Sequence, residues 1–351
     1  MEFRTVVDIE KPLFQIEPCE EILFVGSCFA DAIGSRFREE AFPVAVNPYG
    51  VMYNPASILH TLQRFAATTT PAASPVGPST TPAAFPAGPS TTPAASPAGP
   101  STTPAAFPAG PRVAFLTLGT NHVYRLKATG EIVDNCEKRP QSLFEEEELS
   151  VEACSDYLRQ CVEVLRTINP NIHVVLTVSP IRYRKYGYHE SQLSKATLLL
   201  AAASASATGG SPSTTPAASP AVSTTTPAAS PAGIITYFPA YELLMDELRD
   251  YRFYAPDMIH PSSQAVEYIW ERLVESYFSD AAKDYLHEWH PIKQALAHKP
   301  FNPDSPEYRI FAAQTQQRLA AFLQKYPTAT TPAASAVGGF PAGSPAGSSG
   351  A

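Results

Sequence analysis

Three polar residues have the types needed for acyl transfer through a hydroxyl nucleophile. Ser27 follows a short apolar run that ends in Gly26, and an apolar pattern with helical spacing begins directly after it. Asp257 and His260 lie three residues apart, so the carboxylate could hold one imidazole nitrogen while the other takes the serine proton. Together they supply a nucleophile, a base and a group that orients the base. We therefore predict a catalytic triad of Ser27, Asp257 and His260.

The same chemistry needs hydrogen-bond donors for the negative charge that develops on the substrate oxygen. A helix start favours negative charge, so the backbone N–H of Ser27 is one predicted oxyanion donor. The side-chain amide of Asn121, which comes after another apolar run, is a second. Arg182 follows a further apolar run and could bind an anionic part of the substrate, although a solvated loop explains it equally well.

Each of these residues also has a purely structural interpretation. Ser27 could cap a helix, Asn121 could form a turn, and Asp257 could cap the helix that starts after it. His260 precedes Pro261 and could be a surface residue at a helix start. All four follow predicted strand ends, and this combination favours catalysis over capping.

Other side chains compete for a role in the chemistry. Cys28 is the nearest rival to Ser27, because a thiol at a helix start could also pair with His260. Adjacent side chains on a helix point about 100° apart, so one of the two at most can face the imidazole. The strand-to-helix turn favours Ser27, which leaves Cys28 as a small residue packed against the sheet. His287 and His290 have a spacing that suits a metal, but no third ligand is apparent, so we predict no metal site and no cofactor.

Short apolar runs alternate with segments of helical spacing, which predicts a mostly parallel sheet with helices on both faces. The candidate residues follow the carboxyl ends of the strands, where such sheets form their ligand crevice. We therefore predict a three-layer α/β/α sandwich with a hairpin over 122–134, and we interpret the acidic run 145–148 as a solvated helix face. The predicted strands are 21–25, 42–46, 113–118, 172–178 and 234–238, and the predicted helices are 28–40, 55–65, 151–168, 190–204, 240–250, 262–279 and 306–325.

Three segments have a composition that cannot build a core. Residues 68–111 are four copies of an eleven-residue unit such as STTPAAFPAGP, and related units return in 207–233 and 327–351. They contain no charged residue and few large apolar ones, so we predict disordered, solvated spacers that join the domain at surface loops. Deleting 68–111 and 213–233 should leave folding intact. The remaining chain divides into three parts of one domain and a C-terminal helical extension: 1–67, 112–206 and 234–280, then 281–326.

Charge and cysteine content narrow the class of protein. The 351 residues include 33 acidic and 25 basic side chains, and the net charge of −8 argues against nucleic acid as a partner. No apolar stretch reaches membrane-spanning length, and the first residues make a poor signal peptide. Five cysteines without a CxxC pair suit reduced thiols, so we predict a cytoplasmic location. The oligomeric state is left open.

The stretch VGSCFADAIG resembles the signature of the GSCFA family, which belongs with the SGNH/GDSL-like hydrolases. The likeness extends through NPYGVMYNP, LTLGTNHVYR, NCEKRP, LTVSPIR, QLSKATLLL, YFPAYE and YRFYAPDMIHPS. It covers most of the chain outside the repeats, up to about residue 280. The resemblance implies the SGNH/flavodoxin-like form of the α/β/α sandwich.

The resemblance also implies roles for single residues. Ser27 matches the nucleophile block, although a glycine replaces the aspartate that usually precedes that serine, and 257–260 matches the closing Asp-x-x-His. Asn121, two residues after Gly119, matches the Gly-x-Asn block whose asparagine contributes to the oxyanion hole. The oxyanion glycine of the second block has no clear match, and Gly50 in NPYGVMYNP is our candidate for it.

We therefore predict a serine esterase or acyl hydrolase that works through an acyl-enzyme on a small-molecule or glycan ester. O-acylated carbohydrate is the preferred class by analogy with related hydrolases, and Tyr183, Tyr186 and Tyr188 could stack on a sugar. Gly119 and Arg182 are the predicted substrate-binding residues. Two other functions stay open: a non-catalytic binding protein on the same scaffold, and an O-acyltransferase that shares the acyl-enzyme step.

Overall fold

The computed structural model describes residues 4–69, 107, 110–136, 139–208 and 233–331. At its centre lies a five-stranded parallel sheet with the strand order β2-β1-β3-β7-β8. The strands β1, β3 and β7 are buried along their whole length, because helices cover both faces, and this explains their unbroken apolar sequences. The bounds are Ile22–Gly26 for β1, Val44–Val46 for β2, Val113–Leu118 for β3, His173–Val178 for β7 and Ile235–Tyr237 for β8.

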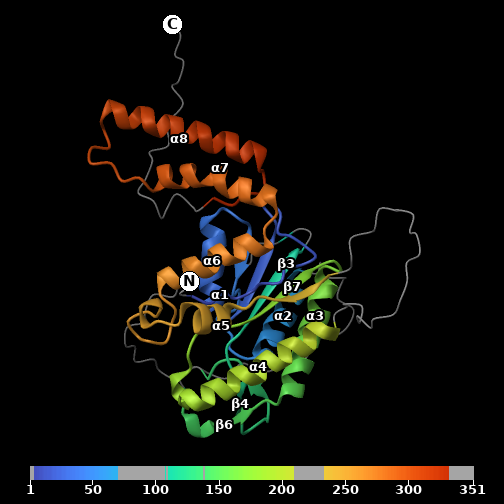
Figure 1. The fold of residues 1–351 in the computed structure, drawn as a ribbon. Coiled ribbons are helices and arrows are strands. Elements are labelled where there is room, and N and C mark those ends of the chain that lie inside the picture. Colours follow the sequence, from blue (N-terminus) through green and yellow to red (C-terminus); the bar gives the residue numbers. More distant parts are fainter. Residues whose placement is uncertain (1–3, 70–106, 108–109, 137–138, 209–232, 332–351) are drawn as a thin grey trace, which may run out of the picture.

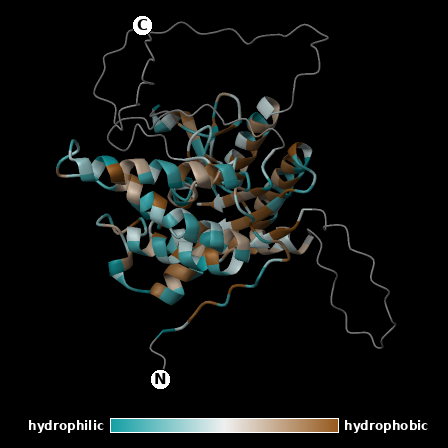
Figure 2. Ribbon diagram, turned by 90° about the horizontal axis from the view of Figure 1, so that it is seen from above, coloured by the Kyte–Doolittle hydropathy of each residue, from teal (hydrophilic) through white to brown (hydrophobic). Residues whose placement is uncertain are grey.

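Helices lie on both faces of this sheet (Figure 1). A hydrophobic cluster on one face joins the sheet to α2 (Pro55–Thr69), α3 (Val151–Ile168) and α4 (Tyr188–Thr208). A second cluster on the opposite face joins it to α1 (Cys28–Glu39) and α6 (Ser263–Tyr277). Figure 2 shows hydrophobic residues concentrated between these layers and hydrophilic residues on the outward helix faces. The predicted three-layer α/β/α sandwich is confirmed.

Serine side chains cap the starts of several helices. Ser27, Ser150 and Ser262 precede α1, α3 and α6, and each accepts a hydrogen bond from a backbone N–H two or three residues further on. The helix predicted over 151–168 has the same bounds as α3, because its cap and its apolar stripe both appear in the sequence.

A second, antiparallel sheet with the order β5-β4-β6 follows the carboxyl end of β3. The predicted hairpin 122–134 is present as β4 (His122–Leu126) and β5 (Ile132–Val133). The interpretation of 145–148 as a helix face is wrong, because β6 (Phe144–Glu148) pairs with β4. Arg125 on β4 forms an ion pair with Glu147. Such cross-strand charge pairs favour a strand conformation for this acidic run.

The segment predicted as one helix over 240–250 has a different form. Three residues of α5 (Ala240–Glu242) lead directly into the π-helix η3 (Leu243–Leu248). Arg249 ends it with a left-handed backbone at φ 41°. The buried carboxylate of Glu247 accepts hydrogen bonds from Arg272 on α6 at 2.7 Å and from the Val7 backbone at 3.0 Å. These contacts connect the segment to α6 and to Val7, which precedes the first strand.

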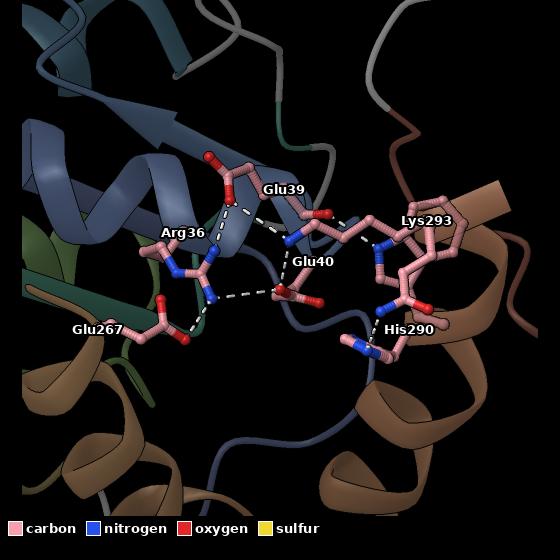
Figure 3. A network of polar contacts seen from close by, with 8 residues as sticks. Arg36, Glu39, Glu40, Glu267, His290 and Lys293 are labelled. Carbon is pink, nitrogen blue, oxygen red and sulfur yellow. Dashed lines mark hydrogen bonds and ion pairs between the residues drawn. The ribbon is translucent and has the colours of Figure 1, made fainter. Parts of the chain in front are cut away.

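Two further helices, α7 (Asp280–Ala297) and α8 (Pro306–Lys325), form the predicted C-terminal extension. Figure 3 shows the polar network that connects it to the sandwich. Arg36 of α1 donates to Glu267 of α6 at 2.9 Å and to Glu39 at 2.5 Å. Lys293 of α7 donates to Glu40 at 2.7 Å. The network therefore joins α1, α6 and α7 around the end of α1.

Most of the predicted spacers fall outside the described residues, but their ends do not. Phe107 is 6% exposed and packs in the cluster under α2 and α3, so the prediction that all of 68–111 is solvated is wrong at this residue. Thr68 and Thr69 belong to α2. Thr330, in the predicted disordered tail, donates its N–H to the Ala41 carbonyl at 2.8 Å. No helix in the described part of the chain has the length and apolar character needed to cross a membrane.

Candidate active site

The central sheet changes its winding direction between β1 and β3, since β2 lies on one side of β1 while β3, β7 and β8 follow on the other. A sheet with this order forms a crevice at the carboxyl ends of the two strands where the direction changes. Gly26 ends β1 there, in register with Thr117 of β3. Ser27 and Cys28 follow β1 at this edge, and Gly119 follows β3.

Gly26 gives the β1–α1 turn its shape. Its φ of 145° is unfavourable for residues with a side chain, and a Cβ at this position would overlap the Thr117 carbonyl oxygen. Its N–H donates to Asn47 Oδ1 at 2.8 Å, and Asn47 Nδ2 donates to Asp31 Oδ1 at 2.7 Å. The turn is thus packed directly against β3 and fixed by side chains from two other segments.

Ser27 is fully buried under this turn. Its Oγ accepts a hydrogen bond from the Phe29 N–H at 3.2 Å and lies 3.3 Å from Thr117 Oγ1. Its own N–H donates to Thr117 Oγ1 at 2.9 Å. These contacts are those of a helix N-cap, which is the structural interpretation that the sequence left open for Ser27.

Cys28 is the first residue of α1 and is only half-buried. Its Sγ lies 3.6 Å from Tyr53 Oη. Burial and the neighbouring thiol raise the pKa of Tyr53, so the phenol keeps its proton at neutral pH and can donate it to the sulfur in a hydrogen bond. The N-terminal end of a helix favours negative charge. Ser27 is fully buried and Cys28 is half-buried, so Cys28 is the more accessible of the two adjacent nucleophile candidates.

The structure brings Asp257 and His260 together. Asp257 Oδ2 lies 2.6 Å from His260 Nδ1, and Asp257 Oδ1 accepts the backbone N–H groups of Ile259 and His260 at 2.9 and 3.0 Å. The backbone N–H of His260, its imidazole and the Ile259 N–H lower the pKa of Asp257 to about 2. The ionised carboxylate therefore holds Nδ1 as a donor and leaves Nε2 available to accept a proton.

The direction of α6 places His260 at the same edge of the sheet as the β1–α1 turn. Arg182, just beyond the carboxyl end of β7, donates its N–H to the Ile259 carbonyl at 3.1 Å. At the other end of α6, the Tyr277 ring contacts Phe14, whose ring stacks at 4.1 Å on His173, the first residue of β7. The helix α6 thus runs from the carboxyl edge of the sheet to its amino edge, as α1 does.

The helices α1 and α6 lie side by side on one face of the sheet (Figure 1), joined by Arg36 and Glu267. From these residues, α1 extends about 12 Å and α6 about 6 Å back to their first residues, at 1.5 Å per residue. Three more residues lead from the start of α6 back to His260. Cys28 and Ile259 pack against the same hydrophobic cluster. Cys28 and His260 therefore lie toward the carboxyl edge of this face, and in the described part of the chain no hydrogen bond joins His260 to Ser27 or Cys28.

The three predicted oxyanion donors have other acceptors in the structure. The Asn121 side-chain amide donates to the Leu149 carbonyl at 2.9 Å. The Gly50 N–H donates to the Asn47 carbonyl at 2.9 Å within a turn. The Ser27 N–H is bonded to β3, as described above. These three hydrogen bonds stabilise the loops at the carboxyl edge of the sheet.

A buried lysine that the sequence analysis did not assign also lies at this edge. Lys195 on α4 is 2% exposed, and its Nζ donates to the carbonyls of Gly119 at 2.6 Å and Ser179 at 2.8 Å. Burial lowers the pKa of Lys195 to about 7. The side chain thus ties the end of β3 to the end of β7. The available signal was a single charged residue within the apolar helical stretch QLSKATLLL.

Gly119, predicted to bind substrate, is closely surrounded by protein. Its N–H donates to the Tyr53 carbonyl at 2.8 Å, and a Cβ at this position would meet Tyr183 Oη. Arg182 lines a cavity of about 260 Å³ and lies over the Tyr254 ring at 5.3 Å. Its backbone bond to the loop before α6 connects the end of β7 to the segment that carries the Asp-His pair.

Of the two histidines considered for a metal site, His290 has a hydrogen-bond partner. His290 Nε2 lies 2.8 Å from the side-chain nitrogen of Gln294. Within the described ranges, no group of three His, Cys, Asp or Glu side chains could hold a metal ion.

Comparisons with known proteins identify the family. The profile of the GSCFA family matches residues 21–78 and 105–273, and that of the "GSCFA domain protein, C-terminal domain" matches 289–331. No curated protein matches the chain. Among solved structures, an acetyl esterase mutant with acetate ion is 9% identical (TM-score 0.37; 73% of this chain and 97% of that chain covered). A carbohydrate esterase family 3 from Talaromyces cellulolyticus is 8% identical (TM-score 0.33; 72% and 94% covered). These structural likenesses are too distant to carry over a reaction, but the family profile spans more than half of the sequence, and the chain belongs to the GSCFA family.

Proposed function

We propose that this protein hydrolyses an ester through a covalent acyl-enzyme. His260 is the base, Asp257 orients it, and the nucleophile comes from the β1–α1 turn. The observation that carries this proposal is the 2.6 Å contact between His260 Nδ1 and Asp257 Oδ2 at the sheet edge where α1 begins. A carboxylate that stays ionised down to about pH 2 favours the tautomer in which Nε2 can take a proton.

The identity of the nucleophile is the point at which geometry and sequence differ. The sequence favours Ser27, but a Ser27 nucleophile would have to leave its cap and its buried position to meet a substrate. Cys28 is one residue further on, partly exposed, and bonded to a phenol that can stabilise its negative charge. We therefore propose Cys28 as the nucleophile and Ser27 as the cap that fixes the turn.

The reaction follows from these roles. His260 takes the thiol proton as Cys28 Sγ attacks the ester carbonyl, the C–O bond breaks, and His260 gives the proton to the leaving alkoxide. Water then loses a proton to His260 and attacks the thioester, which releases the carboxylic acid and restores the thiol. The N–H groups of Phe29 and Ala30 in the first turn of α1 donate to Ser27, which leaves the Cys28 N–H as our candidate for binding the developing oxyanion.

The preferred substrate is an O-acylated carbohydrate. Transfer of the acyl group to a sugar hydroxyl instead of water uses the same intermediate, so product analysis with and without an added sugar acceptor distinguishes the two reactions. A reduced Cys28 is needed in either case, which suits the proposed cytoplasmic location.

Hydrolysis of 4-nitrophenyl acetate by matched variants tests the assignment. We expect Cys28→Ala and His260→Ala to lower kcat/KM at least about 100-fold. Ser27→Ala should keep most of the activity and lower the free energy of unfolding by about 1 kcal/mol through loss of the cap. Cys19→Ala, which removes another half-buried thiol, is the control for activity and should leave kcat/KM unchanged.

Labelling followed by peptide mapping gives an independent measurement. Iodoacetamide should alkylate Cys28 faster than Cys19, whose pKa is raised by burial. A fluorophosphonate adduct on Ser27, together with an inactive Ser27→Ala, would restore the serine assignment. Wild-type protein as inert as His260→Ala would favour a binding protein on this scaffold instead.

A further inference from the structure

We propose that a cavity beside the β1–α1 turn binds the sugar part of the substrate. The cavity has a volume of about 370 Å³, within the usual range for small-molecule sites. It lies between the β4–β5 hairpin, the residues after β3 and the loop after β7. Aromatic and polar side chains dominate its lining, among them Tyr53, Asn54, His122, Tyr124, Tyr183 and Tyr186.

His122 is the first observation that points to a ligand. The side chain is 6% exposed, and among the residues that the structure describes neither ring nitrogen has a hydrogen-bond partner. Nδ1 lies 3.4 Å from Glu146 Oε1, and the ring stacks on Tyr186 with the centroids 3.8 Å apart. A buried polar group without a partner costs about 1–3 kcal/mol. A ligand hydroxyl in the cavity would supply the missing partner.

Tyr183 is the second observation and connects the cavity to the reaction site. Its Oη is also buried without a hydrogen-bond partner among the described residues. Its ring meets the Tyr53 ring edge-to-face at 5.8 Å, and Tyr53 Oη contacts Cys28 Sγ at 3.6 Å. A molecule in the cavity is therefore separated from the proposed nucleophile by one side chain.

The charges around the cavity favour a neutral ligand. Asp134 is paired with His60 at 2.8 Å and Arg64 at 3.0 Å. Glu146 lies 3.5 Å from Lys185 Nζ. Because these carboxylates already have cationic partners, the lining offers no strong attraction for a charged ligand.

A pyranose ring has the chemistry that this lining would recognise. Its hydroxyls both donate and accept, so they can pair with an imidazole and a phenol, and its C–H face can pack on tyrosine rings. This inference rests on the proposed function in one respect: the bound sugar would be the alcohol part of the ester. Binding of the free sugar can still be measured without any catalysis.

Saturation-transfer NMR on the full chain, with methyl glycosides of glucose, galactose, mannose, xylose and N-acetylglucosamine, tests the site. At least one glycoside should show saturable binding. The variant His122→Phe keeps the ring and its stacking on Tyr186 but removes both nitrogens, and we expect it to weaken binding about tenfold. Should that variant fail to fold, Tyr186→Ala at the half-buried wall serves the same purpose. Tyr308→Ala, another half-buried tyrosine but on α8, is the matched control and should bind as wild type does.

The outcomes separate this inference from the proposed function. No saturable binding of any of the five glycosides overturns the sugar site, even if 4-nitrophenyl acetate is hydrolysed. Binding that survives both cavity variants places the sugar elsewhere and also overturns it. If the wild-type protein has no esterase activity but binds a glycoside, and the cavity variants lose this binding, the sugar site is supported and the proposed ester hydrolysis is refuted. In an active enzyme, His122→Phe should raise KM for an acetylated glycoside about tenfold, whereas Tyr308→Ala should leave this KM at the wild-type value.

Discussion

Gly26 is the residue on which the shape of the proposed site depends most directly. Its backbone conformation brings the chain so close to β3 that Ser27 bonds to Thr117 twice, and this contact determines which side of the turn faces the protein. The next residue, Cys28, then begins α1 in a half-buried position. One glycine thus decides which of two adjacent small residues is buried.

We expect Gly26→Ala to destabilise the protein strongly. The new Cβ would overlap the Thr117 carbonyl, and the φ of 145° would be strained in addition. Gly130→Ala is the matched control, since Gly130 also has a positive φ, of 74°, but has open space around it. In urea denaturation, Gly26→Ala should lose at least about 2 kcal/mol more than Gly130→Ala. Equal losses would mean that the close approach to β3 contributes nothing.

The sequence indicates where the proposed site lies, but it does not indicate which of Ser27 and Cys28 is buried. Ser27 follows a predicted strand end, and Asp257 and His260 follow the last strand–helix unit; strand and helix patterns are local, and parallel topology brings these segments to one edge of the sheet. Whether Ser27 or Cys28 is exposed depends on the packing of Gly26 against another strand, which no local pattern records. The role of Lys195 depends in the same way on two carbonyls from distant loops.

The elements themselves follow the sequence pattern where that pattern is long. The eighteen residues of α3 match their predicted bounds because cap and apolar stripe agree. The helix prediction for 145–148 is wrong because this acidic segment becomes a strand through pairing with β4, which comes earlier in the chain. The π-helix η3 likewise forms among contacts with α6 and residue Val7, and these are not visible in its own six residues.

The amino edge of the sheet contains a histidine that should make stability depend on pH. His173, 8% exposed at the start of β7, accepts the Ile234 N–H at Nδ1 (3.2 Å) and stacks on Phe14. Burial, with a smaller effect of Arg112, lowers the pKa of His173 to about 4, against about 6.5 in an unfolded chain. Between these two pKa values the unfolded chain binds more protons at this histidine than the folded protein does. The contribution of His173 to the free energy of unfolding is therefore complete above about pH 6.5 and is lost as the pH falls to about 4.

A histidine replacement measures this contribution. His173→Gln keeps an acceptor for the Ile234 N–H but does not titrate. Between pH 7 and pH 4, wild type should lose up to about 3 kcal/mol more unfolding free energy than His173→Gln. His287→Gln, at an exposed position on α7, should follow the wild-type curve. Parallel curves for all three proteins would show that His173 is not held neutral by the fold.

At the scale of the whole molecule, the fold is interrupted by long segments of biased composition, yet its sheet order and layers are complete without them. Low-complexity composition predicts where the interruptions lie, because such sequences cannot bury enough apolar surface to fold. It does not predict their exact ends. Phe107 belongs to a repeat unit by sequence, but it belongs to the core beside α2 and α3 by position.

Two variants measure this difference: one replaces the repeat segment, and the other removes the Phe107 side chain from the core. Replacing residues 70–106 with a Gly/Ser linker of about ten residues should change the Tm by no more than about 2 °C, because the cost of loop closure depends only weakly on loop length. Phe107→Ala in the full chain should instead cost about 3 kcal/mol, since it empties a buried aromatic site. Phe85→Ala, the same substitution in another repeat copy, is the matched control and should leave the Tm unchanged. A large loss of stability in the linker variant would mean that the repeats support the fold, whereas a neutral Phe107→Ala would mean that the core ends at α2.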